Sequence, residues 1–268
     1  MCGLVGIISY DGSLSYVKSQ AIRRGFANLL KNSENRGRMA SGVCSVTDKD
    51  IFVFKNGSLA SKLLEEKEYY RIVTDTVKTG VNLKCLLGHT RHPTKGSAAF
   101  NVNNHPILAG KVIGLHNGHI QNDDILFSMM KYNIKRIGQV DSEIIFRLLD
   151  HELHKGRTLI DAVKSVHDRL LGDYACAFVD SRLPRYLTIF TNAESYSNLY
   201  LYVYPNIKVM AFASTEEILK KSLKGDSALE PGFASTKTQF LNGGARIDME
   251  NGGLRRFELS KELLPFID

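Results

Sequence analysis

The chain opens with Met1-Cys2-Gly3-Leu4-Val5-Gly6-Ile7-Ile8, in which a cysteine directly follows the initiator methionine. Because the side chain of Cys2 is small, we expect Met1 to be excised, which would make Cys2 the N-terminal residue. A thiol has a reference pKa of about 8.5 and a free α-amine one of about 7.7–8.0, so the amine of residue 2 could accept the thiol proton at neutral pH. The opening stretch therefore predicts an N-terminal nucleophile that carries its own base.

The residues after Cys2 predict where this nucleophile would lie. The apolar, β-branched run from Leu4 to Tyr10 indicates a strand, and Asp11-Gly12 signals the turn that ends it. Cys2 would then lie at one end of a sheet. A cysteine at position 2 is also compatible with an ordinary free thiol, so the interpretation depends on the rest of the chain.

Composition predicts a soluble globular protein. The 268 residues, 43% hydrophobic and 24% charged, can form one domain spanning 1–268. No apolar run approaches the roughly 18–20 residues that cross a membrane, and no secretory signal is evident, so we expect a cytoplasmic protein without membrane contact. The net charge of +7 is compatible with an acidic partner, a phosphorylated metabolite or nucleic acid. Nucleic acid is disfavoured because the basic residues are scattered.

Cysteine and histidine spacing argues against a metal site. Cys44, Cys85 and Cys176 lie in β-like stretches without CxxC spacing and are predicted to be buried core thiols. Five histidines crowd the polar segments described below, but their irregular spacing favours hydrogen bonding over metal binding: His89, His92, His105, His116 and His119. Neither GxGxxG nor GxxxxGK[ST] is present. No metal or cofactor is therefore expected.

Hydrophobic periodicity predicts alternating strands and helices. Helical spacing covers 15–30, about 65–78, 141–154 and 158–170, and strand-like runs cover 42–46, 51–55 and 85–90. From residue 174 onward short β runs alternate with turns, and the pairs Gly243-Gly244 and Gly252-Gly253 are interpreted as turn signals. Strands before and after grouped helices predict two stacked, mainly antiparallel sheets with helices on their outer faces.

Three polar, glycine-containing segments lie between the apolar strands, at 35–42, 88–96 and 115–122. Each could be only a turn; the Asn117-Gly118 dipeptide, for example, is frequent in hairpins. Their occurrence together with Cys2 makes a shared functional site the better interpretation.

With these segments the chain resembles the class II glutamine amidotransferases, the N-terminal-nucleophile (Ntn) glutaminase domains of glucosamine-6-phosphate synthase, amidophosphoribosyltransferase and asparagine synthetase. The glucosamine-phosphate synthase branch is the most similar. The ordered match comprises Cys2-Gly3-Leu4-Val5-Gly6, Arg36-Gly37, Ala40-Ser41-Gly42, Gly88-His89-Thr90-Arg91, Asn104-His105-Pro106, His116-Asn117-Gly118 and Asp141-Ser142-Glu143-Ile144-Ile145, with weaker similarity at 172–175 and 212–216.

The resemblance implies an α/β (α+β) fold, a four-layer α/β/β/α sandwich of two mainly antiparallel sheets. It also implies catalytic roles. Cys2 would attack the side-chain amide of L-glutamine to form a γ-glutamyl thioester, Asn117 and Gly118 would stabilise the oxyanion, and Arg36 would orient the Cys2 end of the site.

The same resemblance implies a substrate-binding set. Arg91, assisted by the Thr94 hydroxyl, would pair with the α-carboxylate of glutamine, and Asp141 would pair with its ammonium. His92 and His105 complete this expected substrate-binding set. One departure concerns the lid over the substrate, because His92-Pro93-Thr94-Lys95 replaces the usual Trp-Ala-Thr-His. A second is Met39, where an aspartate is common. A lid that differs from that of the synthase branch is expected.

No acceptor domain is recognised after the glutaminase match, so we expect ammonia to pass to a separate synthase protein; homo-oligomerisation stays open. Two alternatives remain. The chain could hydrolyse another γ-glutamyl amide or peptide through the same thioester. It could also be an inactive domain that binds glutamine and regulates a partner, which would follow if Met1 were retained.

Overall fold

Strand β1 (Gly3–Ser9) lies inside a sheet because all seven of its residues are small or apolar enough to be buried on both faces. It pairs antiparallel with β10 (Val209–Ala213) on one side and with β4 (Leu83–Arg91) on the other. The computed structural model describes residues 2–192, 198–224, 229, 236–240 and 242–259. The strand that begins after Cys2 is therefore central to the molecule.

Two antiparallel sheets form the middle of the structure. The first has the order β11-β9-β10-β1-β4-β2-β3 and the second the order β13-β12-β8-β7-β6-β5. The remaining strands of the first sheet are β2 (Ala40–Thr47), β3 (Ile51–Asn56), β9 (Leu199–Tyr204) and β11 (Thr236–Phe240). Those of the second are β5 (Ile107–Ala109), β6 (Val112–Ile120), β7 (Gly172–Asp180), β8 (Tyr186–Asn192), β12 (Asn242–Asp248) and β13 (Leu254–Glu258).

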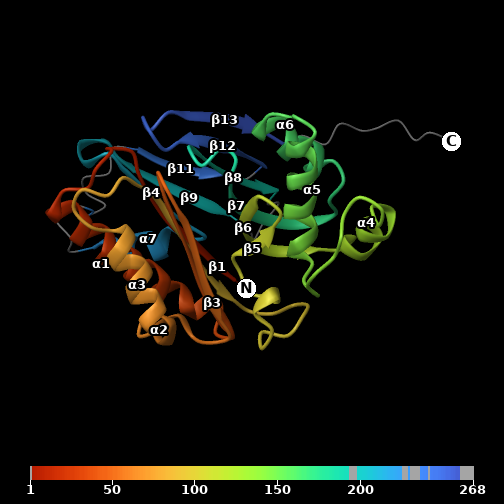
Figure 1. Cartoon of the computed structure of the whole chain (residues 1–268), viewed down its shortest axis with the longest axis horizontal. Coiled ribbons are helices and arrows are strands. Elements are labelled where there is room, and N and C mark those ends of the chain that lie inside the picture. Colours follow the sequence, from red (N-terminus) through yellow and green to blue (C-terminus); the bar gives the residue numbers. More distant parts are fainter. Residues whose placement is uncertain (1, 193–197, 225–228, 230–235, 241, 260–268) are drawn as a thin grey trace.

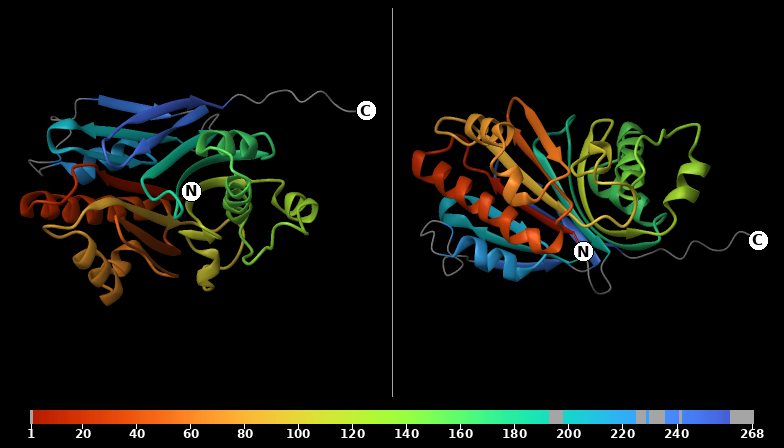
Figure 2. Two further views of the ribbon diagram at one scale, coloured as in Figure 1. Left: turned by 45° about the horizontal axis from the view of Figure 1, so that its top comes forward. Right: turned by 90° about the horizontal axis from the view of Figure 1, so that it is seen from below.

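Helices cover the outer face of each sheet, as Figures 1 and 2 show. The first sheet is covered by α1 (Tyr16–Ser33), α2 (Ala60–Leu63), α3 (Lys67–Thr76) and α7 (Glu216–Leu223). On the second sheet lie α4 (Asp123–Met129), α5 (Ser142–His154) and α6 (Leu159–His167). Short 3-10 turns occupy Glu34–Arg36, Asn101–Asn103 and Pro205–Ile207. Within the described residues no helix is long and apolar enough to cross a membrane.

Three apolar clusters correspond to the three interfaces between these layers. One joins the first sheet to its helices through residues such as Phe26 and Val5. Another fills the space between the sheets, with Leu4 and Phe212 from the first sheet and Leu115 from the second. The third joins the second sheet to its helices and includes Phe146. The predicted four-layer α/β/β/α sandwich is confirmed.

Most predicted elements are present, with shifted ends. Helix α1 begins after Ser15, whose hydroxyl accepts the Lys18 N–H and caps the helix. The predictions of helices at 141–154 and 158–170 are confirmed by α5 and α6. Buried positions for Cys44, Cys85 and Cys176 are also confirmed.

One turn prediction is wrong. Gly243 and Gly244 lie inside β12, paired with β8 on one side and β13 on the other. A Cβ on Gly244 would lie 2.0 Å from the Ile189 carbonyl oxygen, so this glycine permits close strand packing. The other pair is a turn: Gly252 has φ +75° and closes the β12–β13 hairpin by bonding to Asp248.

Phe146 offers a test of the packing of α5 on the second sheet. Its ring is fully buried and occupies the place where a Cβ on Gly114 of β6 would lie, with ring carbons 2.0–2.4 Å from that position. We predict that Phe146→Ala lowers the free energy of unfolding by about 3–5 kcal/mol, measured by urea denaturation. Tyr132→Ala, at an 87% exposed position, is the control and should change it by less than about 0.5 kcal/mol. Equal effects would contradict this packing.

Candidate active site

Cys2 is held at the start of β1 by contacts with two other segments. The Nε of Arg36 donates to the Cys2 carbonyl oxygen at 2.7 Å, and the His92 backbone N–H donates to the Cys2 Sγ at 3.3 Å. The β1–β4 register, which pairs Gly3 with Thr90, brings His92 to the thiol. Met1 lies outside the described residues.

The surroundings of Cys2 keep its thiol protonated until a base removes the proton. Burial raises the pKa of the Cys2 thiol, while the His92 N–H and the positive charge of Arg91 act in the opposite direction. The charge of Asp141 reaches the same thiol and raises its pKa further. Because the net shift is upward, a neighbouring base is needed to generate the thiolate at neutral pH.

Arg91, at the end of β4, is 3% exposed and is positioned by its own loop and by Asn104. Its guanidinium donates to the Asn104 Oδ1 at 2.9 Å and to the carbonyl oxygens of Lys95 and Gly96 at 2.6 and 2.8 Å. These bonds use three of the five guanidinium N–H donors. The remaining donors of this fixed cation can bind a carboxylate.

The loop after Arg91 is fastened to helix α4 by an ion cluster. Lys95 Nζ lies 2.7 Å from Asp123 Oδ2 and 2.8 Å from Asp124 Oδ2, at the first turn of α4. Arg136 binds the same two carboxylates. Lys95 is one of the residues by which this chain departs from the synthase branch. The altered loop is therefore held in place by an ion pair that one of its altered residues makes.

Asp141 is buried and lies at the start of α5. Its Oδ1 accepts the Ser142 N–H at 2.9 Å, and its Oδ2 accepts the Ile120 N–H at 2.8 Å and lies 3.3 Å from His119 Nδ1. The carboxylate therefore caps the helix and joins it to the end of β6. A cationic group entering from the Cys2 side would find this anion already fixed.

Asn117 of β6 is connected to the nucleophile strand through Ser214. The Asn117 Nδ2 donates to the Ser214 Oγ at 2.7 Å, and the Ser214 Oγ both accepts the Leu4 N–H at 2.8 Å and donates to the Leu4 carbonyl oxygen at 3.1 Å. One amide hydrogen of Asn117 is thereby used on Ser214, and the amide has a second N–H donor.

Gly118 follows Asn117 with a φ of +129°, a backbone conformation that L-residues with a side chain rarely adopt. A Cβ at this position would lie 2.0 Å from the Asp173 carbonyl oxygen on β7. Both residues lie within β6 and not in a hairpin turn. The Asn-Gly dipeptide thus marks a distorted strand position next to the thiol strand.

Three of the histidines form a buried cluster. The rings of His89 and His105 are 4.1 Å apart and those of His105 and His116 are 6.4 Å apart. The His89 Nε2 contacts the His116 carbonyl oxygen at 2.9 Å, and the His116 Nδ1 contacts the Ser142 Oγ at 2.7 Å. Burial lowers the pKa of His89 to about 3 and of His116 to about 4, and holds that of His105 well below its usual range. All three are therefore neutral at pH 7.

The structure brings most of the predicted site residues together. Cys2, Arg36, Arg91 and Asp141 are linked by the contacts and charges described above, and Ser214 joins Asn117 to β1. His92 contributes its backbone N–H, while its side chain is exposed. Thr94 is exposed on the fastened loop and His105 is buried within the histidine cluster. Their roles in substrate binding stay predictions.

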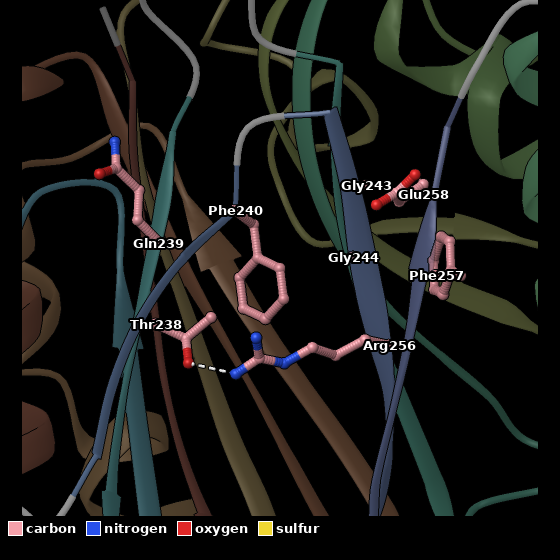
Figure 3. A pocket seen from close by; sticks show the side chains of 8 residues that line it. All are labelled: Thr238, Gln239, Phe240, Gly243, Gly244, Arg256, Phe257 and Glu258. Atoms are coloured by element: carbon pink, nitrogen blue, oxygen red, sulfur yellow. Dashed lines mark hydrogen bonds between the residues drawn. The ribbon is translucent and has the colours of Figure 1, made fainter.

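Among the described residues no group of three or more His, Cys, Asp or Glu side chains is arranged to hold a metal ion. A cavity of about 360 Å³ lies elsewhere, where β11 approaches β12 and β13. In Figure 3 the Arg256 side chain crosses it toward Thr238, to whose hydroxyl it donates at 2.8 Å. Strands β9 and β10 separate β11 from β1, so this cavity is not part of the Cys2 site.

Comparison with protein families and solved structures agrees with this geometry. Residues 95–221 match the family model of a glutamine amidotransferase domain. Glutamine phosphoribosylpyrophosphate amidotransferase from B. subtilis has the same fold, with a TM-score of 0.70 at 17% identity over 97% of this chain and 50% of that one. A glutamine aminotransferase class-II domain protein from Silicibacter pomeroyi superposes with a TM-score of 0.57 at 14% identity over 96% of this chain and 100% of that one.

The chain belongs to the class II glutamine amidotransferases. This amidotransferase has the fold of the Ntn hydrolases, whose members in this family use an N-terminal cysteine nucleophile. It is 31% identical over 191 residues to the glutamine–fructose-6-phosphate aminotransferase [isomerizing] of Wigglesworthia glossinidia brevipalpis, covering 70% of this chain and 28% of the relative. The relative from Caulobacter vibrioides is 32% identical over 186 residues, covering 66% and 26%. The chain thus spans less than a third of the length of these relatives.

Several residues of this amidotransferase site received no role from the sequence. Ser214 lies in a weakly matching segment, and only the pairing of β1 with β10 brings it to Leu4. Asn104 was part of a matching motif, but its bond to Arg91 depends on the loop conformation. Lys95 was noted only as a departure from the motif of the synthase branch. A charged residue at a position where the motif departs from the family pattern is a signal that could have prompted a search for its ion-pair partner.

The neutral histidine cluster of the amidotransferase predicts a pH dependence of stability. Unfolded histidines have pKa values near 6.5, above the folded values of about 3 for His89 and about 4 for His116. The unfolded state therefore binds protons first as pH falls, and the free energy of unfolding should decrease below pH ~6.5. We predict a loss of about 1.4 kcal/mol per buried histidine between pH ~7.5 and ~5.5, measured by urea denaturation.

The matched variants for this measurement are His105→Gln and His154→Gln. His105 is 3% exposed and His154 is exposed. His105→Gln should have a shallower pH slope than the parent protein whatever its stability at pH ~7.5, because one buried neutral histidine is gone. His154→Gln should keep the parent slope. Identical slopes for all three proteins would contradict the assignment.

Proposed function

We propose that the protein is a glutaminase subunit that hydrolyses L-glutamine to glutamate and ammonia and passes the ammonia to an acceptor synthase. The observation that carries the proposal is the position of the Cys2 thiol beside the His92 N–H, within reach of the charges of Arg91 and Asp141. A nucleophile flanked by a fixed cation and a fixed anion suits an amino acid that carries both a carboxylate and an ammonium.

The first half-reaction forms a thioester. After removal of Met1, the α-amine of Cys2 accepts the thiol proton and the Sγ attacks the side-chain amide carbon of glutamine. The C–N bond then breaks, and the amine returns its proton to the departing nitrogen, which leaves as ammonia. The raised pKa of the Cys2 thiol makes this adjacent base necessary.

The second half-reaction hydrolyses the thioester. The Cys2 amine removes a proton from water, which attacks the acyl carbon; the C–S bond breaks, glutamate leaves and the thiol is restored. Both half-reactions pass through an oxyanion. The second Nδ2 hydrogen of Asn117 and the Gly118 N–H are the proposed donors to it, supported by the bond that fixes the other hydrogen on Ser214.

Substrate recognition is proposed for the two fixed charges. Arg91 keeps two guanidinium N–H donors beyond its three bonds to Asn104, Lys95 and Gly96, and these would bind the α-carboxylate. The Asp141 carboxylate, already accepting two backbone N–H groups, would accept the ammonium. Because both partners are held rigidly before binding, little ordering of the site is required.

The fate of the ammonia is proposed from the relatives. The names of two relatives contain an acceptor besides glutamine. It is fructose-6-phosphate in glutamine–fructose-6-phosphate aminotransferase and phosphoribosylpyrophosphate in glutamine phosphoribosylpyrophosphate amidotransferase. The matching region spans only part of each of those proteins. We therefore infer that this chain supplies ammonia to an acceptor synthase.

A labelling experiment on Cys2 tests the proposed nucleophile. Incubation with a diazo-ketone norleucine, a glutamine analogue that alkylates thiols, should give a protein that lacks Met1 and carries one adduct, mapped to Cys2 by peptide mass spectrometry. Cys2→Ala should take up no adduct and lose glutaminase activity by more than about 10³-fold. Cys44→Ala, which removes a fully buried thiol, is the control and should be labelled normally. Retained Met1 without an adduct would instead support a glutamine-binding regulatory domain.

A second test concerns the positioning of Asn117 by Ser214. We predict that Ser214→Ala lowers kcat for glutamine by at least about tenfold with KM nearly unchanged, because the misplaced donor acts mainly on the transition state. The matched control is Ser222→Ala, since Ser222 is also a buried hydroxyl, bonded to Asn32 at 3.0 Å on the far side of the first sheet. An equal fall in kcat for both variants, or a change confined to KM, would contradict this role.

A further inference from the structure

A groove lies on the helical layer that covers the second sheet. Its volume is about 630 Å³, and it is lined by residues of α4, α5 and the segments after α4 and α6: Asn122, Ile125, Leu126, Met129, Met130, Asn133, His151, Lys155 and Arg169. Its apolar lining residues, Ile125, Leu126, Met129 and Met130, come from α4 and its C-cap. None of the residues assigned to the Cys2 site lines it.

Two of these apolar side chains are widely open to solvent. Met129 is 73% exposed and Ile125 is 62% exposed, on the same face of α4. A site for a small molecule encloses its ligand, and large apolar side chains exposed this far would contribute little to such enclosure. Adjacent exposed apolar side chains around a groove are typical of a surface that another protein covers.

The lining residues that follow α5 and α6 carry positive charge. Both ionic side chains that line the groove, Lys155 and Arg169, are cations, and both lie beside the buried carboxylate of Glu152, at 4.0 and 3.0 Å. Arg157 binds the same carboxylate at 2.6 Å. One carboxylate therefore faces three cations, and positive charge remains in excess along this edge. A partner with carboxylates beside apolar side chains would complement it.

Helix α4 connects this groove to the loop that follows Arg91. Ile125 and Met129 line the groove from the same short helix whose first turn, Asp123 and Asp124, holds Lys95. The carbonyl oxygen of Lys95 in turn accepts a hydrogen bond from Arg91. A protein seated on the groove would thus contact the helix that anchors the loop at the substrate-binding arginine.

We propose that this groove is the docking site of the ammonia-accepting protein, which inserts an acidic amphipathic segment with apolar side chains against Ile125 and Met129 and carboxylates toward Lys155 and Arg169. The identity of the partner as the acceptor rests on the proposed function. The existence of the docking site rests on the exposure, shape and charge of the groove alone.

The test uses two short fluorescein-labelled synthetic peptides with leucines at helical i, i+3, i+4, i+7 spacing, one with glutamates at the intervening positions and one with lysines there. Anisotropy titration should show that the acidic peptide binds the parent protein and weakens with added salt, while the basic peptide does not bind. Met129→Glu and Lys155→Glu should each weaken the acidic peptide by at least about tenfold.

Tyr70→Glu is the matched control, because Tyr70 is a 70% exposed apolar residue on α3, in the other helical layer. It should bind the acidic peptide as the parent does. Failure of the acidic peptide to bind, equal binding of both peptides, or equal weakening by Tyr70→Glu would overturn the proposal. So would a dimer of the parent protein that Met129→Glu converts to a monomer in sedimentation, since the occupant would then be a second copy.

Glutamine hydrolysis measured on the same preparations separates the two proposals. Met129→Glu, Lys155→Glu and Tyr70→Glu should all keep the parent rate, because none of these residues touches the Cys2 site. Peptide binding without glutamine hydrolysis would leave the docking site standing and reject the glutaminase role. Hydrolysis without selective peptide binding would reject the docking site alone.

Discussion

The candidate active site depends on one hydroxyl group that connects the two sheets. Ser214, which follows β10 in the first sheet, accepts the Leu4 N–H and donates to the Leu4 carbonyl oxygen, while accepting the amide of Asn117 in the second sheet. Leu4 is two residues from Cys2, so the distance between the thiol and the proposed oxyanion donor is set by this small network. Its members are buried, where an unpaired polar group is costly, and this favours a single arrangement.

The two sides of the site are built differently. Cys2, Asn117 and Gly118 lie at or within strands whose neighbours fix them, as the 2.0 Å clearance at Gly118 illustrates. Arg91 instead receives its final geometry from the loop carbonyls of Lys95 and Gly96. The proposed catalytic residues thus lie on a rigid framework, whereas the proposed substrate-binding arginine depends on a segment held by an ion cluster at α4.

Sequence patterns predicted the four layers, because strand and helix periodicity is local. They also named candidate site residues, several of which the structure brings together around Cys2. They could not predict α4, a seven-residue helix too short for a clear period, or the strand position of Gly243 and Gly244, which depends on pairing with both neighbours. The contacts of Ser214 could not be predicted for a related reason. A serine after a strand is ordinary, and its partners are 97 and 210 residues away.

The burial of three thiols has a consequence for covalent chemistry. Cys44, Cys85 and Cys176 are 0% exposed, and burial raises the pKa of Cys44 to about 12 and those of the other two well above their usual value. Thiolates at these positions are scarce and shielded, so electrophiles and oxidants have one accessible sulfur among four. The folded protein has a single thiol accessible to modification, that of Cys2, which is also its proposed nucleophile. Any reagent that modifies one thiol per chain therefore reports on that site alone.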